Sequence, residues 1–76
     1  MRNITLAQLK GNQKAKIADI LGGRGVTSKL MSLGIYKGKE ILKLSHIGLR
    51  GPVVIKAGRT ILALGHGIAE KIAVEV

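Results

Sequence analysis

The residues that could carry acid–base or metal chemistry are few. The chain has two histidines, one aspartate and three glutamates, and it has no cysteine. Neither His46 nor His66 has a second ligand at close spacing, except that Glu70 follows His66 by four residues. On a helix, His66 and Glu70 would share a face and could hold a metal ion weakly. A histidine bonded to solvent or backbone is the more ordinary interpretation, so we expect no metal site and no cofactor.

The glycine cluster GGRG, residues 22–25, is the other segment with a chemical interpretation. It lies between a predicted strand and a predicted helix, where a phosphate-binding loop would be found. It lacks the Lys-Ser/Thr ending with which such a loop binds phosphate and magnesium. The sequence also lacks a nucleophile elbow and paired carboxylates. We therefore interpret 22–25 as a flexible break and expect a protein that is not an enzyme and works by binding a partner.

Composition favours one small folded domain over residues 1–76. Hydrophobic residues make up 46% of the chain and Tyr36 is the only aromatic residue, so the core must be aliphatic. Without cysteine there are no disulfides or thiolate metal sites. We find no signal peptide, and no apolar run approaches the roughly 20 residues that span a membrane. We expect a cytoplasmic protein, with recruitment to the inner face of the membrane as an option.

The formal net charge of +9 favours anionic partners; the alternative interpretation is that the charge only keeps a small apolar protein in solution. A basic barrel that binds RNA or the ribosome is the alternative function, supported by Arg24, Arg50 and Arg59 in predicted loops. Against it stands the near absence of aromatic side chains for base stacking. Nucleic acid is therefore the less favoured partner.

The segments that must position these residues are short. One helix is predicted over 26–34, with Thr27 or Ser28 as N-cap and Gly34 at its C-terminal end. Short helical turns are expected after Thr5 and within 65–72, and a loop over 46–52. Alternating residues predict five strands, over 14–21, 39–45, 53–57, 60–64 and 73–76.

Two details of the strands can be stated from the sequence. Gly58 and Arg59 form a two-residue connection, and Gly58 suits the first central position of a type II′ turn. In the strand 39–45 we place Lys43 on the polar side, opposite the apolar residues. Short strands with glycine-rich turns indicate a small closed or half-closed barrel, because there is no room for crossover helices. Open edges near the termini would also allow a homodimer.

Three stretches together resemble one known family. The stretch LAQLKGNQKAKIADILGG resembles the opening of the FeoA family (ferrous iron transport protein A), and residues 51–76 resemble its end, with a Pro-Val strand and a glycine hairpin. KLMSLGIYKGKEI resembles the family's L-x-x-L-G-I-x-x-G-x-x-I hallmark, although Lys37 stands where many members have proline. The matching hallmark residues are Leu30, Leu33, Gly34, Ile35, Gly38 and Ile41.

The resemblance implies a mainly β fold, an SH3-like barrel of about five strands with one inserted helix and short helical turns. It also implies a cytoplasmic accessory protein that binds the G-protein portion of a FeoB-type membrane Fe(II) transporter. The same barrel resembles the C-terminal domain of regulators of the diphtheria toxin repressor type. This sequence carries no helix-turn-helix segment of such a regulator.

The hallmark segment also suggests where a partner would bind. Leu33 is expected to anchor the helix in the core, and Gly34, Gly38 and Gly58 to form structural turns. The hydrophobic residues at the glycine-bounded helix end would then contact the partner, within a basic rim that favours encounter. The predicted partner-binding residues are Leu30, Met31, Ile35 and Tyr36, with Lys29, Lys37 and Lys39 as the rim.

Overall fold

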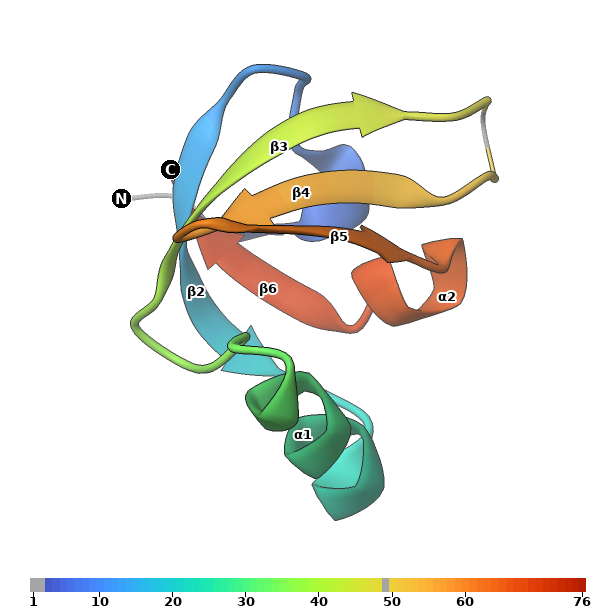
Figure 1. The fold of residues 1–76 in the computed structure, drawn as a ribbon. Coiled ribbons are helices and arrows are strands. Elements are labelled where there is room, and N and C mark those ends of the chain that lie inside the picture. The colour runs from blue at the N-terminus through green and yellow to red at the C-terminus, as the bar shows by residue number, and fades with distance from the viewer. Residues whose placement is uncertain (1–2, 49) are drawn as a thin grey trace.

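A computed structural model describes residues 3–48 and 50–76 and shows a curved sheet with helical segments at its ends (Figure 1). In chain order the elements are β1 (Asn3–Thr5), the 3-10 helix η1 (Leu6–Gln8), β2 (Lys14–Ile20), α1 (Gly23–Ser32), β3 (Glu40–His46), β4 (Val53–Ala57), β5 (Thr60–Leu64), α2 (His66–Ala69) and β6 (Ile72–Glu75).

All strands belong to one antiparallel sheet in the order β1-β6-β2-β3-β4-β5. This confirms the mainly β fold class. The five predicted strands are present, and β1 is a sixth that the sequence did not reveal, because three residues are too few to display alternation. Within the described residues β1 and β5 are the two edges, so the sheet curls without closing.

The core is aliphatic, as the composition predicts. Strand alternation builds it: in β4, Val53, Ile55 and Ala57 are buried, while Val54 and Lys56 face the other way. A tightly packed aliphatic interior gives a domain of this size most of its stability. Its remaining buried members are Leu6, Leu9, Ala15, Ile17, Leu30, Ile35, Ile41, Leu64, Ala69, Ile72 and Val74.

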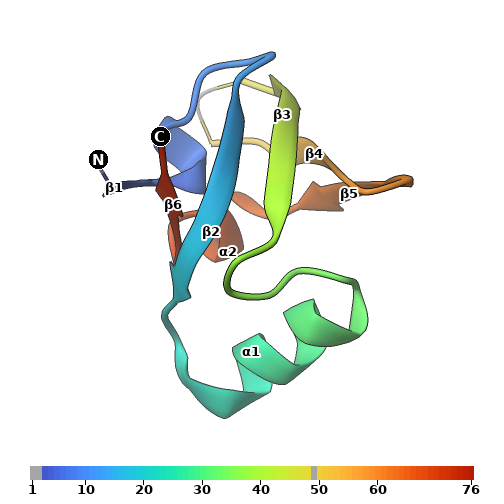
Figure 2. The same cartoon turned by 90° about the vertical axis from the view of Figure 1, so that its left-hand side faces the viewer.

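Helix α1 lies beyond the end of β2 (Figure 2) and begins earlier than predicted. Its N-cap is Gly22, in the left-handed region at φ 103°, so the expectation of Thr27 or Ser28 as N-cap was wrong. The reason is local: the Thr27 hydroxyl donates to the Gly23 carbonyl at 2.9 Å, one turn back inside the helix. The glycine cluster is thus largely the first turn of the helix.

The C-terminal end of α1 follows from the hallmark segment. The N–H of Ile35 donates to the Leu30 carbonyl at 2.8 Å, and the N–H of Gly34 donates to Met31 at 3.0 Å. This is the Schellman pattern, which requires the positive φ of 89° that Gly34 adopts. The accompanying apolar contact brings Leu30 and Ile35 into the core.

Burial of the two helix leucines is the reverse of the prediction. Leu30 is 3% exposed and belongs to the core, whereas Leu33 is 39% exposed. The helix ends at Ser32, so Leu33 is the C-cap and lies past the last turn that faces the sheet. Leu30 instead occupies the position on which the residue after the glycine packs.

The hairpin between β4 and β5 has the predicted turn. Ala57 pairs with Thr60 across the two-residue connection, and Gly58 has a φ of 64°. Arg59 is not among the residues with positive φ, which is the type II′ combination. Gly38, which precedes β3, also has a positive φ, at 93°.

Candidate functional site

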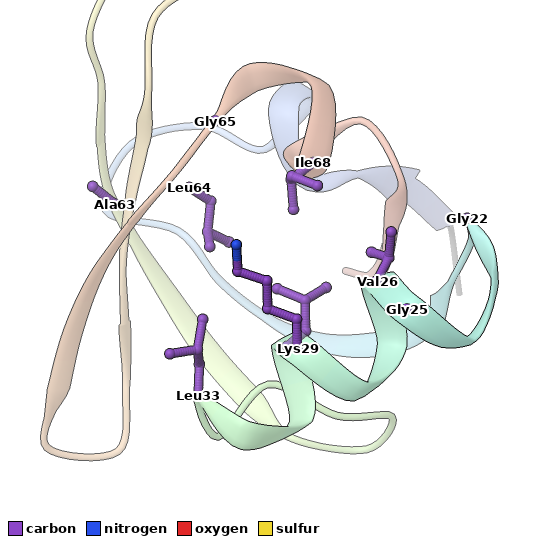
Figure 3. A pocket seen from close by; sticks show the side chains of 10 residues that line it. Gly22, Gly25, Val26, Lys29, Leu33, Ala63, Leu64, Gly65 and Ile68 are labelled. Carbon is purple, nitrogen blue, oxygen red and sulfur yellow. The ribbon is translucent and has the colours of Figure 1, made fainter.

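A groove of about 500 Å³ separates helix α1 from the end of β5 and the start of α2 (Figure 3). We call it the α1 groove. On the helix side it is lined by Val26, Lys29, Leu30 and the C-cap Leu33, and on the other side by Ala63, Leu64, Gly65 and Ile68; Gly22 and Gly25 complete it.

The groove is apolar with one positive charge. Among its lining residues only Lys29 is charged, and no acidic residue is present. The Lys29 side chain extends from the helix over the groove in the direction of Leu64 (Figure 3). Gly25 leaves open space on the helix side of the groove, since a Cβ at this position would meet no atom within 4 Å. The arrangement suits an apolar side chain accompanied by a negative charge.

Two of the residues predicted to bind a partner, Lys29 and Leu30, line this groove. Met31 and Tyr36 are exposed but lie outside its lining, as do Lys37 and Lys39. Ile35 is completely buried and offers no surface to a partner, because the Schellman turn folds it onto Leu30. At the end of α1, the residues that line the groove are therefore those on the side of the helix that faces β5.

The opposite wall of the groove was missed by sequence reasoning. Leu64 was interpreted only as a strand residue, and Ile68 only as part of a short helical turn. Their approach to α1 depends on how the sheet curls, for which the sequence holds no local signal. Gly65 and Gly67 indicate a turn in this segment, but they do not indicate that the turn lies next to α1.

Lys43 is buried in the core, contrary to the prediction that it lies on the polar side of its strand. It is 1% exposed. Side chains of a strand alternate, so Lys43 must share the inner face of β3 with Ile41, while Leu42 and Leu44 are half-buried on the other face. The run of apolar residues around it concealed this periodicity.

The Lys43 ammonium is held by the carbonyls of the η1 turn. It donates to Leu6 O at 3.2 Å, to Ala7 O at 3.1 Å and to Leu9 O at 2.5 Å. Leu6 O also accepts the backbone N–H of Leu9 at 3.2 Å. The last carbonyls of a helical turn have no partner within the turn, so the cation satisfies those of Ala7 and Leu9. Burial lowers the pKa of Lys43 below its usual 10.5. The three carbonyl acceptors act in the opposite direction, because they favour the ammonium form.

A row of imidazoles continues from this lysine to the surface. His46 Nδ1 lies 3.4 Å from Lys43 Nζ, His46 Nε2 lies 3.3 Å from His66 Nδ1, and His66 Nε2 lies 3.4 Å from Glu70 Oε1. His46 ends β3, so its predicted place in a loop was wrong; that loop also includes Leu49, outside the described residues. The two histidines contact each other, where isolated solvent or backbone contacts were expected.

The Lys43 ammonium disfavours a cation bound to His46. When Lys43 is the ammonium, His46 Nδ1 accepts from it, and neutral imidazoles then complete the row with their protons on Nε2. A metal ion on His46 Nε2 would move the proton to Nδ1, where it would face the ammonium. Across residues 3–48 and 50–76, no group of three His, Cys, Asp or Glu side chains could hold a metal ion.

No helix in the described part of the chain is long and apolar enough to cross a membrane.

Comparison with known proteins gives a consistent result. The model of the FeoA domain matches residues 4–76. A crystal structure described as the iron uptake regulatory protein FeoA superposes with a TM-score of 0.88 and 29% identity, covering 99% of this chain and 97% of that one. No curated protein matches the sequence significantly.

Two more distant structures share the fold alone. A zinc-complexed FeoA from Stenotrophomonas maltophilia, described as a prokaryotic SH3 domain protein, has a TM-score of 0.79 and 22% identity, covering 95% of this chain and 89% of that one. A manganese-dependent transcriptional repressor has a TM-score of 0.86 and 18% identity; the match covers 95% of this chain but only 40% of the repressor. The SH3-like fold and the family match over residues 4–76 lead to one conclusion: the chain belongs to the FeoA family, which is implicated in ferrous iron transport.

Proposed function

We propose that this chain is a non-catalytic cytoplasmic accessory protein of ferrous iron uptake that binds and modulates the G-protein portion of a FeoB-type membrane Fe(II) transporter. Membership of the FeoA family supports a transport role. The observation that carries the proposal is the α1 groove, an open apolar recess on a small, well-packed domain.

An apolar recess of this kind is unfavourable in water unless a partner covers it. Burial of apolar surface stabilises a protein by about 25 cal/mol per Å², and surface that stays hydrated does not contribute this free energy. The loss matters for a domain of 76 residues, because small domains are only marginally stable. Leu33 is exposed at the groove and Met31 follows Leu30 on the same helix. Exposed apolar surface beside charged residues is typical of protein-binding sites.

The charge of the surface agrees with an acidic partner surface. Lys29 extends over the groove, and the exposed Arg24 lies on the first turn of the same helix. Lys71 lies close to Gly22, which lines the groove, since a Cβ on Gly22 would lie 3.0 Å from Lys71 Cδ. Such charges accelerate encounter and select against basic partners.

The test is calorimetric titration of the chain with the purified cytoplasmic G-protein domain of the transporter from the same genome. Leu33→Gln should weaken binding about tenfold or more, because a central apolar contact is lost. Ile47→Gln is the matched control: Ile47 is also an exposed aliphatic residue but does not line the groove. Equal affinity of Leu33→Gln and wild type would remove the groove from the interface.

A further inference from the structure

We infer that the partner is captured as an added β-strand: an extended, acidic segment pairs with the free edge of β5, places an apolar side chain in the α1 groove and sets a carboxylate against Lys29. The identity of the partner rests on the proposed function. The mode of recognition rests on the backbone of β5 and the composition of the groove.

The free edge follows from the hairpin register. Residues flanking a two-residue turn form a hydrogen-bonded pair, and such pairs alternate along an antiparallel ladder. Ala57 pairs with Thr60 and Ile55 with Leu62, so these β5 residues direct their N–H and C=O groups to β4. Ile61 and Ala63 therefore direct theirs to the open side. Within the described residues no strand pairs with that side of β5.

This edge runs into the groove. Ala63, Leu64 and Gly65 all line it. The Ala63 methyl points away from the groove in Figure 3, so Ala63 faces the groove with its main chain. A strand added to β5 would lie about 4.8 Å away, and every second side chain would point to the face on which Leu64 is found.

The edge also lacks protection. Natural sheets guard their edges with charged residues, proline or bulges. The five residues of β5 read TILAL, with neither charge nor proline, and their pairing with β4 has no register shift. Ile61 is 63% exposed. An unguarded edge in a natural protein indicates a surface that is covered by another strand.

Charge decides between the two possible occupants of such an edge. A second copy of this chain would bring a net charge of +9 to a face that already holds Lys29 and, at the adjoining turn, Arg59. An acidic segment is attracted to the same groups, and no carboxylate lines the groove to oppose it. The free N–H groups of β5 require an extended segment, since a helix satisfies its own backbone groups.

The discriminating variant is Ala63→Pro, with Ala63→Val as its control. Proline removes the outward N–H and places ring carbons on the edge, and the ladder to β4 does not use that N–H. Valine is similar in size to proline and keeps the backbone N–H, and its side chain would point away from the groove as the Ala63 methyl does. Against the transporter's G-protein domain we expect Ala63→Pro to lose binding at least about tenfold and Ala63→Val to change it less than about threefold.

Hydrogen exchange provides a measurement that does not depend on the folding of a variant. In the wild-type chain, the Ile61 and Ala63 amides should exchange at least about tenfold more slowly once the G-protein domain is added. Lys29→Glu should weaken the complex more than Lys29→Gln does, because the glutamate would place a carboxylate against the carboxylate of the acidic segment.

Each outcome has a defined meaning. Wild-type binding that survives Ala63→Pro, or unchanged exchange at both amides in the complex, overturns strand addition while leaving the proposed function intact. Absence of any wild-type binding overturns the proposed function and this proposal together. Dimerisation of the free chain through β5, seen by sedimentation and abolished by Ala63→Pro, overturns the acidic segment as occupant.

Discussion

Replacing Lys43 with methionine should destabilise the fold strongly, even though methionine fills a similar volume with apolar atoms. The substitution removes the donor for the carbonyls of Leu6, Ala7 and Leu9. An acceptor left unsatisfied in the interior is unfavourable by about 1–3 kcal/mol. Two carbonyls, those of Ala7 and Leu9, lose their only donor, because Leu6 O still accepts the Leu9 N–H. Their loss outweighs what is recovered when a charge no longer has to be buried, and we predict a net loss of about 1–3 kcal/mol.

That loss is large relative to the whole. A domain of 76 residues has a free energy of unfolding of about 4–11 kcal/mol. Urea unfolding followed by circular dichroism measures the difference, provided that the m-values agree. Lys56→Met is the control, because Lys56 is exposed on β4, and it should change stability by no more than about 0.5 kcal/mol. A Lys43→Met protein as stable as wild type would refute the view that the ammonium satisfies the η1 carbonyls.

Three further predictions follow from single features. Because burial lowers the pKa of Lys43, the unfolded chain binds more protons than the native chain between that lowered pKa and about 10.4. The stability of wild type relative to Lys43→Met should therefore rise with pH in that window. A flat or falling stability difference in urea unfolding measured from pH 7 upward would contradict this. Gly34→Ala should lose about 1–2 kcal/mol in thermal or urea unfolding, because alanine is strained at a φ of 89°, whereas Gly25→Ala should keep or raise stability and yet weaken partner binding by filling the groove. If the RNA-binding alternative holds, retention of RNA on filters should be electrostatic and fall steeply between about 50 and about 200 mM salt, and absence of retention at low salt would exclude that alternative.

Much of the fold could be predicted from the sequence because its signals are local. Period-two alternation located the strands, and Gly58 predicted the turn between β4 and β5. The hallmark glycine marked the end of α1, since the Schellman turn depends only on residues 30–35. Where a local pattern had two solutions the prediction was wrong, as for the start of α1 and for the choice between Leu30 and Leu33 as core residue.

The candidate site was less accessible because it depends on contacts between distant segments. Lys29 and Leu30 could be chosen from the helix alone. Leu64 and Ile68 reach the same groove through the curl of the sheet. Likewise Lys43 finds its acceptors more than 30 residues earlier in the chain, at Leu6 and Leu9, and no spacing rule connects them.

The central claim, that the α1 groove is the surface through which this chain acts, is tested most directly by methyl NMR of the complex. Spectra of the isotope-labelled chain would be recorded with and without the unlabelled cytoplasmic G-protein domain of the FeoB-type transporter. The account predicts that the methyl signals of Val26, Leu33, Leu64 and Ile68 shift or broaden together while those of Ile47 stay in place. Binding that moves other methyl signals and leaves these four unchanged would contradict it.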